Sequence, residues 1–453
     1  MIVRVARQFP IIRFDAAMTL VKRHIHRLWF PAPGEGGAIP SRAGLGMSAE
    51  EFDRLMPQEF WREVVDRVAA EAPDTLLLAE AFWLLEGYFV RTLGMHRVYN
   101  SAFMHMLRDE KNADYRQLIK NTLEFDPEIL RRYVNFQNNP DEKTAIEQFG
   151  KGDKYFGVCI MMCTMPGLPM FGHGQIEGYT EKYGMEFRYP KLWEWPDSAL
   201  VARHEREIFP LLRRRYLFAG VERFRLFDCV TAEGWVNEDV FAYTNAYGEE
   251  RALVLYHNKF ATATGRIHLS VPYAVKRGGE KVMTRETLAQ ALGLRDDPAR
   301  YTVFRDAISG LEFIRNNRAL HSAGLELTLN AYEYHVFDRI EEVVDDADHP
   351  YAALHAELGG RWVASIADEL EIVRLKPVTL AYQKLIDAAR LRQLLQAAAD
   401  ATPEAILRAV ADDGRALFTA MQMHILGAAD VAHCALLGQK LCDDLWQAIA
   451  LRL

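Results

Sequence analysis

The first 215 residues alternate short apolar runs with longer stretches of helical periodicity, and this alternation constrains the fold more than any other feature. A short apolar run bounded by turn residues is typical of a buried strand, and apolar residues three and four positions apart are typical of a covering helix. Repeated strand and helix units predict an α/β fold with a parallel sheet. The strand candidates are FPIIRFD (9–15), TLLLAEAFW (75–83), HRVYNSAF (96–103), RYVNFQNN (132–139) and MPGLPMFGH (165–173).

The pattern changes twice further along the chain. Residues 216–340 hold short alternating strands separated by turn residues, which predicts an all-β antiparallel sandwich. We expect a helical insert at about 281–321 to interrupt it. Residues 341–453 open with an acidic run and are then rich in Ala and Leu at helical spacing, which predicts a C-terminal α-helical domain. The first domain accordingly spans residues 1–215.

The composition excludes several classes of protein. Lys and Arg number 54 against 62 Asp and Glu, a net charge of −8 with no basic face, so nucleic acid is not an expected partner. The chain has no apolar run of about 18 residues, so we expect no membrane span. Five cysteines without metal-ligand spacing indicate a reducing compartment, and we expect a cytoplasmic location and no bound metal. The oligomeric state does not follow from these features.

Three carboxylates each follow a predicted strand: Asp15 after FPIIRF, Glu80 after TLLLA and Asp141 after RYVNFQNNP. In a β/α barrel the carboxyl ends of the strands form the rim on which catalytic side chains converge. The 61 residues from Glu80 to Asp141 fit two β/α units with one strand between them. A single acidic residue after a strand is also common as a helix cap or a solvated charge, so the three candidates are stronger together.

The residues around two of these carboxylates predict opposite protonation states. Glu80 lies in the apolar run LLLAEAFW, where burial raises the pKa and keeps a general acid protonated. Arg13 lies two residues before Asp15, on the same side of a strand, so its guanidinium can hold that carboxylate ionised. An ionised and a protonated carboxyl about 5–5.5 Å apart are what retaining glycoside hydrolysis requires. Asp141 is the candidate for a third carboxylate that holds substrate hydroxyls.

These stretches resemble, in order and spacing, the motifs of the α-amylase family (glycoside hydrolase family 13). RFDAA (13–17) is similar to the fourth-strand motif, LAEAFW (78–83) to the fifth, FQNNPDE (136–142) to the seventh and PGLPMFGHGQ (166–175) to the eighth strand and its loop. The later strands, closing with AYEYHVF (331–337), resemble the β-domain that follows the barrel in this family. The resemblance covers residues 1 to about 340 and implies a partial (β/α)8 barrel, strands four to eight, followed by the sandwich.

The resemblance implies a role for each motif residue. Asp15 is then the nucleophile that forms a glycosyl ester, Glu80 the acid and later the base, and Asp141 the stabiliser of the transition state. Arg13 orients Asp15, and Asn139 supports Asp141. The implied activity is retaining hydrolysis of α-glucans or maltooligosaccharides. The alternatives are an α-glucan transglycosylase of the same family and a non-catalytic carbohydrate-binding or scaffold protein.

The sequence departs from the family pattern in several places. Pro140 stands where the family has a His, and Ala17, Met18 and Thr19 replace the Lys-His pair that often follows the nucleophile. Strands one to three, and the domain that usually follows strand three, would lie before Met1, so we expect the C-terminal part of a longer protein. A small open sheet of five strands is the alternative. Because family members bind Ca²⁺ chiefly through that domain, we expect no cofactor here.

Side chains beside the motifs extend the predicted substrate site. Trp83 is placed to stack on a sugar ring, with core packing as the equal alternative. His173 and Gln175 follow the last predicted strand, where side chains can face the cleft, although a structural role is the favoured alternative for an isolated His. Together with Arg13 and Asn139 they form the predicted substrate-binding set.

Overall fold

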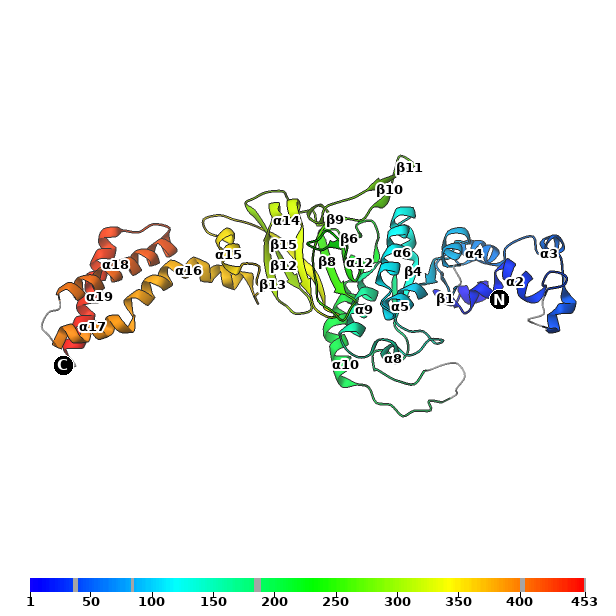
Figure 1. Ribbon diagram of the computed structural model, residues 1–453, viewed down its shortest axis with the longest axis horizontal. Helices are drawn as coiled ribbons and strands as arrows, with labels where there is room; N and C mark the ends of the chain where they lie inside the picture. The colour runs from blue at the N-terminus through cyan, green and yellow to red at the C-terminus, as the bar shows by residue number, and fades with distance from the viewer. Residues whose placement is uncertain (36–39, 83–84, 183–188, 400–403, 452–453) are drawn as a thin grey trace. The chain divides into compact units, whose positions relative to one another are not determined.

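The computed structural model describes residues 1–35, 40–82, 85–182, 189–399 and 404–451. The chain divides into two compact units (Figure 1). Unit 1 consists of Met1–Asp296, Phe304–Gly310 and Arg318–Ile340. Unit 2 consists of Asp297–Val303, Leu311–Asn317 and Glu341–Leu453.

Unit 1 opens with a five-stranded parallel sheet in the order β1-β2-β3-β4-β5. The strands are β1 (Ile11–Phe14), β2 (Leu76–Ala79), β3 (Arg97–Tyr99), β4 (Tyr133–Phe136) and β5 (Leu168–Met170). Each lies within a predicted strand. The inner strands β2, β3 and β4 are largely buried, as expected where both faces of a parallel sheet are covered, whereas the edge strands β1 and β5 are half-buried to exposed. The predicted α/β fold with a parallel sheet is confirmed, as a half-barrel. The numbering of these strands within a full barrel stays a prediction.

The helices of unit 1 join and cover these strands. In α4 (Phe60–Glu71) the residues Trp61, Val64, Val65 and Val68 recur at helical spacing, and all four are buried. The other helices of the half-barrel region are α1 (Ile2–Ala6), α2 (Lys22–Trp29), α3 (Ala49–Leu55), α5 (Ser101–Arg108), α6 (Asn112–Phe125), α7 (Glu128–Arg132), α8 (Ala145–Phe149), α9 (Asp153–Thr164), α10 (Ser198–Arg203), α11 (Phe209–Arg213) and α12 (Arg215–Ala219).

The later strands build one eight-stranded antiparallel sheet in the order β13-β12-β15-β8-β7-β6-β9-β14. The predicted antiparallel region is confirmed in this form, as one continuous sheet where the sequence predicted the two sheets of a sandwich. The strands are β6 (Arg225–Val230), β7 (Val240–Tyr247), β8 (Glu250–His257), β9 (Ala263–Ser270), β12 (Arg300–Asp306), β13 (Glu312–Asn316), β14 (Leu325–Leu329) and β15 (Tyr334–Val344).

A separate hairpin pairs β10 (Tyr273–Arg277) with β11 (Glu280–Thr284). Gly278 and Gly279 form its turn with φ of 59° and 88°. A two-residue hairpin turn needs this positive φ, which glycine adopts without a steric cost.

The predicted helical insert at about 281–321 is wrong. β11, β12 and β13 occupy much of this stretch, and its helices are the short α13 (Leu288–Ala291) and α14 (Asn317–Ala323). The Ala- and Leu-rich segment around α13 has helical spacing, but it is only one turn long. The following residues include Tyr301, Thr302, Val303 and Phe304, and β-branched and aromatic side chains favour a strand that can pair within a large sheet.

Helix α9 is buried on every side. Its run FGVCIMMCT belongs to a hydrophobic cluster that also contains residues of the parallel sheet and of β7 and β8. At Gly157 the helix meets β8, where a Cβ atom would lie 2.0 Å from the Tyr256 ring, so only glycine fits. Cys159 and Cys163 are buried free thiols that pack in this cluster as small hydrophobic residues. The two sheets of unit 1 therefore share one core.

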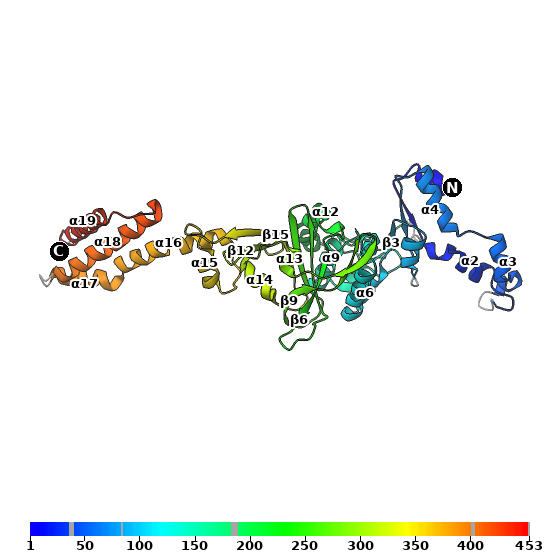
Figure 2. The same ribbon diagram turned by 90° about the horizontal axis from the view of Figure 1, so that it is seen from above.

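The region predicted as helical is helical from Tyr351 onward. Its helices are α15 (Tyr351–Leu358), α16 (Ile366–Leu385), α17 (Ala388–Ala399), α18 (Glu404–Leu426) and α19 (Val431–Ala450). Figure 2 shows α18 alongside α19. Gly414 and Gly438 face each other there, and a Cβ on Gly438 would lie 2.5 Å from the backbone nitrogen of Arg415.

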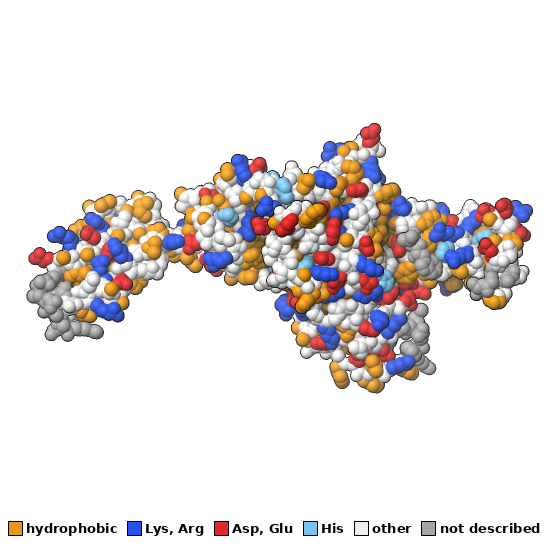
Figure 3. All heavy atoms as spheres, viewed as in Figure 1, with side chains coloured by type: hydrophobic (Ala, Val, Ile, Leu, Met, Phe, Trp, Pro, Cys, Tyr) orange, Lys and Arg blue, Asp and Glu red, His pale blue; other side chains and the backbone are white. Residues whose placement is uncertain are grey.

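None of the described helices combines the length and apolar composition that crossing a lipid bilayer requires. Acidic and basic side chains are interspersed over the face of the molecule shown in Figure 3.

Candidate active site

Two of the three predicted carboxylates meet at the carboxyl edge of the parallel sheet. β1 and β2 pair with Phe14 opposite Ala79, so the next residues, Asp15 and Glu80, lie beside each other. The pairing continues by one further bond, because the N–H of Glu80 donates to the carbonyl of Phe14 at 3.0 Å. Strand order and register therefore make the predicted nucleophile and the predicted acid neighbours.

Arg13 joins these two carboxylates through one guanidinium. Nη1 donates to Oδ1 of Asp15 at 2.7 Å, and Nη2 donates to Oε2 of Glu80 at 3.0 Å. Nε donates to the hydroxyl of Tyr99, at the end of β3, at 2.7 Å. The contact predicted from the two-residue spacing of Arg13 and Asp15 is confirmed. The contacts with Glu80 and Tyr99 depend on the pairing order of the strands.

The turn after β1 is bonded to Glu80. Ala16 has a left-handed backbone, with φ 43° and ψ 39°. This conformation costs a residue with a Cβ about 1–2 kcal/mol. It lets the N–H of Ala16 donate to Oε2 of Glu80 at 3.0 Å, and the N–H of Ala17 donates to the Glu80 carbonyl at 2.9 Å. The turn that carries Asp15 is thus held by both the backbone and the side chain of Glu80.

The two carboxylates differ sharply in their access to water. The Glu80 side chain is 2% exposed, and that of Asp15 is 56% exposed. Burial is the main cause that raises the pKa of Glu80, and the Asp15 carboxylate adds to the rise, whereas the Ala16 N–H and Arg13 oppose it. The predicted direction of this pKa shift is confirmed. Oε1 of Glu80 is buried and has no hydrogen-bond partner among the described residues, so it is the oxygen on which a proton can sit.

Tyr99 is a site residue that the sequence analysis missed. Its side chain is buried, and burial raises the pKa of its hydroxyl while the bond from Arg13 lowers it. The net rise keeps this hydroxyl neutral, so it accepts the Arg13 N–H without adding a charge. The predicted strand HRVYNSAF offered no local signal for this role, because the contact of Tyr99 with Arg13 depends on the pairing order of the strands.

Asp141 lies on the loop after β4, separated from β2 by β3. It is exposed, its N–H donates to Oδ1 of the buried Asn139 at 3.0 Å, and Lys182 donates to its carbonyl. The predicted support of Asp141 by Asn139 thus takes the form of a bond to the backbone. The hydrogen bonds and ion pairs of the described residues join Asp141 to neither Asp15 nor Glu80.

The remaining predicted substrate-binding residues lie near the end of β5 or outside the described residues. Gln175 is buried, its Nε2 donates to Oε1 of Gln137 at 2.6 Å, and its Oε1 accepts the N–H of Gly172 at 3.0 Å. Its amide therefore braces the loop. His173 is exposed, with its ring 6.4 Å from that of Tyr179. Trp83 lies outside the described residues. The roles of these residues in binding substrate stay predictions.

Polar residues after β4 form a second feature that sequence reasoning missed. Gln137 donates from Nε2 to the carbonyl of Tyr155 at 2.8 Å and is fully buried. Asn138 is buried next to Gly172, where a Cβ would lie 2.4 Å from the Asn138 amide, and its Oδ1 has no described hydrogen-bond partner. The consecutive amides in FQNN were the available signal, since buried polar groups need partners.

The described residues contain no group of three or more His, Cys, Asp or Glu side chains arranged to hold a metal ion. The expectation of a site without metal or cofactor stays a prediction.

Comparison with known proteins gives matches only at the level of structure. The chain matches no protein-family model and no curated protein sequence. A debranching enzyme from Nostoc punctiforme, soaked with acarbose, matches with 15% identity and a TM-score of 0.42 over 62% of this chain and 54% of that chain. An alpha-amylase from Geobacillus thermoleovorans, complexed with acarbose, matches with 14% identity and a TM-score of 0.42 over 63% of this chain and 57% of that chain.

A noncanonic maltogenic alpha-amylase, AmyB from Thermotoga neapolitana, matches with 11% identity and a TM-score of 0.39 over 63% of this chain. The match covers 57% of AmyB. The chain thus spans little more than half the length of the solved structures that it matches.

Proposed function

We propose that the protein is a retaining glycoside hydrolase that acts on α-glucans or maltooligosaccharides. The observation that carries this proposal is Arg13, whose guanidinium bonds the exposed Asp15 and the buried Glu80 at once. An ionised and a protonated carboxyl side by side are what the retaining reaction needs. The similarity of the surrounding motifs to those of the α-amylase family supports α-glucan as the substrate class.

In the proposed first step, Asp15 attacks the anomeric carbon, and Glu80 transfers its proton to the departing glycosidic oxygen. The bond to that oxygen breaks, an ester forms between the sugar and Asp15, and Glu80 is left ionised. The N–H groups of Arg13 and Ala16 on Oε2 stabilise this new carboxylate. In the second step, Glu80 takes a proton from water, whose oxygen attacks the sugar and releases Asp15. A transglycosylase would use a sugar hydroxyl in place of this water.

The other predicted residues take supporting roles in the proposal. Asp141 holds substrate hydroxyls as the third carboxylate, on the loop that Asn139 fixes. His173 binds the sugar from the end of β5, Gln175 keeps that loop in place, and Trp83 stacks on a sugar ring.

A non-catalytic carbohydrate-binding protein is the second candidate, and the burial of Glu80 favours it. Both donors that reach this carboxylate bind the same oxygen, Oε2, and the side chain is 2% exposed. A buried carboxylate held by an Arg and a backbone N–H also serves as a structural ion pair. This candidate predicts binding of maltooligosaccharides without turnover.

A pair of substrates separates general acid catalysis from a structural role. We would assay the full chain on a maltooligosaccharide and on a 2,4-dinitrophenyl maltooligosaccharide, and compare wild type with Glu80→Gln. Removal of a general acid lowers the rate by about 10²–10⁴-fold where the leaving group needs a proton. We expect that loss on the maltooligosaccharide, whose sugar leaving group needs a proton, and a much smaller loss in the first turnover of the dinitrophenyl substrate, because its leaving group departs without a proton.

Glu86→Gln is the matched control. Burial raises the pKa of this half-buried carboxyl too, but it makes no described bond to Arg13 or Asp15. Asp15→Ala should abolish turnover of both substrates. An equal loss on both substrates for Glu80→Gln, or activity that survives Asp15→Ala, would contradict the assigned roles. Wild-type protein that binds but never cleaves either substrate would establish the non-catalytic candidate.

A further inference from the structure

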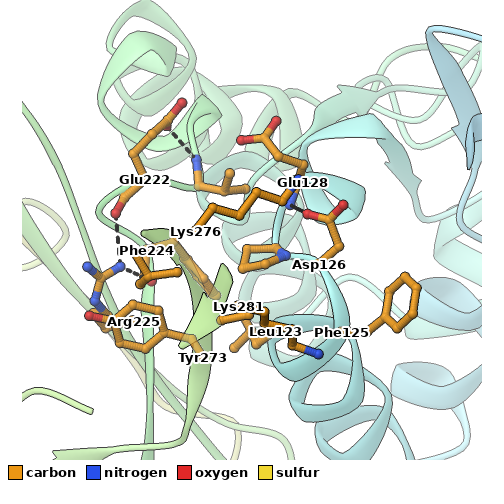
Figure 4. Close-up of a pocket in the computed structure, with 14 residues that line it drawn as sticks. Leu123, Phe125, Asp126, Glu128, Glu222, Phe224, Arg225, Tyr273, Lys276 and Lys281 are labelled. Atoms are coloured by element: carbon orange, nitrogen blue, oxygen red, sulfur yellow. Dashed lines mark hydrogen bonds between the residues drawn. The ribbon is translucent and has the colours of Figure 1, made fainter. Parts of the chain in front are cut away.

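A cavity of about 350 Å³ lies in unit 1, on the side of the half-barrel away from the candidate active site. It is formed where α6 ends and α7 begins, against the start of β6 and the β10–β11 hairpin (Figure 4). α7 leads directly into β4, so the cavity lies toward the amino edge of the parallel sheet. Its lining is mostly apolar and includes Leu123, Val221, Phe224, Tyr273 and Val275.

Two lysines of the hairpin line this cavity. Lys276 of β10 lies directly opposite Lys281 of β11 in the antiparallel register, and both are exposed. Like charges at directly opposed positions destabilise a hairpin, whereas the neighbouring pair, Arg277 and Glu280, has opposite charges. Neither lysine forms an ion pair with a carboxylate in the described part of the chain. Lys281 Nζ instead lies 5.7 Å from the centre of the Phe125 ring.

The acidic residues of the cavity are largely engaged elsewhere. Arg131 binds Glu128 at 2.7 Å and Glu222 at 3.5 Å. Asp126 accepts the N–H of Glu128 at 3.2 Å and is the one lining carboxylate, among the described residues, without a cationic partner. Because one Arg131 faces two carboxylates, the acidic residues of the lining balance the two lysines in formal charge. What distinguishes the mouth of the cavity is a pair of opposed lysines that form no ion pair with a carboxylate among the described residues.

Arg225, the remaining cation in the lining, is already neutralised. Its Nε donates to Glu286 at 2.7 Å, and its guanidinium lies 3.9 Å from the centre of the Tyr273 ring. The cationic groups that remain for a ligand are therefore Lys276 and Lys281.

We propose that this cavity binds a small apolar monocarboxylate, with its hydrocarbon part on the apolar floor and its carboxylate between Lys276 and Lys281. The carboxylate accepts a charge-assisted hydrogen bond from each ammonium group and offsets the repulsion between them. The volume lies at the small end of the range of about 300–1,000 Å³ for ligand pockets. A sugar is a poor occupant because its hydroxyls need many polar partners that the apolar floor lacks.

Octanoate tests this proposal by calorimetric titration of the full chain. 1-Octanol has the same hydrocarbon chain without the charge, and acetate has the charge without the chain, so both should bind much more weakly than octanoate. We expect Lys276→Gln and Lys281→Gln each to weaken octanoate binding about five- to tenfold, since each removes one charge-assisted hydrogen bond. Arg277→Gln is the matched control on the same hairpin, and it should leave the affinity unchanged because Arg277 does not line the cavity.

Ala274→Trp provides a second variant, because Ala274 lines the cavity and an indole there would occupy the floor. We expect it to abolish octanoate binding while the thermal unfolding midpoint stays near that of wild type. The proposal is overturned if octanoate fails to bind, if 1-octanol binds as tightly, or if octanoate affinity survives the lysine substitutions. Octanoate binding that persists in a folded Ala274→Trp variant would place the ligand elsewhere and also overturn it. None of these outcomes depends on the chemistry proposed for Asp15 and Glu80.

Discussion

At the scale of single residues, the candidate site depends on how Arg13 divides its donors. Three of its N–H groups go to three acceptors: Asp15, Glu80 and the hydroxyl of Tyr99. A guanidinium is planar and fixes the directions of its N–H groups, so a hydrogen bond to one nitrogen also fixes the directions in which the other two donate. By accepting from Nε, Tyr99 therefore orients Nη1 and Nη2 of Arg13 toward the two carboxylates.

Tyr99→Phe tests this orienting role. The ring stays, the acceptor for Nε is lost, and we expect unfolding to become easier by about 1 kcal/mol. Under the proposed function, kcat should fall about tenfold with little change in KM, because the substrate contacts are untouched while the carboxylates lose their common support. The pH–rate profile should also shift, since Arg13 affects the pKa of Glu80.

Tyr133→Phe is the comparison variant for this test. Burial raises the pKa of Tyr133 to about 12, and its hydroxyl makes no hydrogen bond to the described residues. A Tyr99→Phe enzyme with the same kcat and pH profile as Tyr133→Phe would show that the hydroxyl only fills space.

The same residues show what the sequence could predict at this scale. Arg13 and Asp15 are two positions apart in one strand, so their contact follows from strand geometry alone. The contact of Arg13 with Tyr99 joins residues 86 positions apart and requires that β1, β2 and β3 pair in chain order. No local pattern contains that information, and the tyrosine therefore looked like an ordinary core residue.

At the scale of elements, a partly buried ion group centred on His335 joins β12 to the start of β15. His335 binds Asp306 through Nδ1 at 3.0 Å and Glu333 through Nε2 at 3.3 Å. Burial lowers the pKa of His335, but the bonds to Asp306 and Glu333 outweigh it and raise the pKa to about 9. The imidazolium therefore stays charged across neutral pH.

This pKa gives a stability prediction with a definite sign. The folded-state pKa of about 9 exceeds the value of 6.5 expected after unfolding. The stabilisation that the charged His335 contributes to the folded state is therefore fully present below about pH 6.5 and is lost as pH rises through 9. The loss should be on the order of 3 kcal/mol. Calorimetric unfolding between those pH values should show a falling midpoint for wild type and a flatter curve for His335→Gln. His433→Gln, at an exposed position of α19, should keep the wild-type slope.

The contact of α18 with α19 gives a second prediction at this scale. A Cβ on Gly438 would lie 2.5 Å from the Arg415 nitrogen and 2.6 Å from the Ala411 carbonyl, so the helices must separate to accommodate it. We expect Gly438→Ala to destabilise this pair by about 1–3 kcal/mol, as overpacking does. Hydrogen exchange of peptides from 404–451 should speed up. Leu436→Ala, at a side chain 70% exposed on the same helix, should leave exchange nearly unchanged.

The strands differ in how far their own residues predict them. The strands of the half-barrel could be predicted because each is a compact apolar run between turns. β12 and β13 could not, because they lie in a stretch whose clearest local signal is the short helix α13. β12 and β13 are stabilised by pairing with neighbouring strands in the eight-stranded sheet. A strand stabilised mainly by partners far away in the sequence is difficult to predict from its own residues.

At the scale of the whole molecule, the sequence predicted two successive sheets but not their common core. The pattern of apolar residues changes near residue 216, from strand and helix units to alternating strands. Neither part of the sequence indicates that α9 contacts both sheets. The helix reads as continuously apolar, which fits any deeply buried helix. Only the pairing of Gly157 with Tyr256, 99 positions away, reveals which surface covers it.

This shared helix bears on how such a chain can be inherited. A recombination event between α9 and β6 would join a helix that has a notch at Gly157 to a sheet lacking the ring that fills it. The half-barrel would then carry an open apolar groove, and the incoming sheet would expose an aromatic face. We therefore expect the two halves of unit 1 to pass between genes as a single module, with the candidate site and the monocarboxylate cavity travelling together.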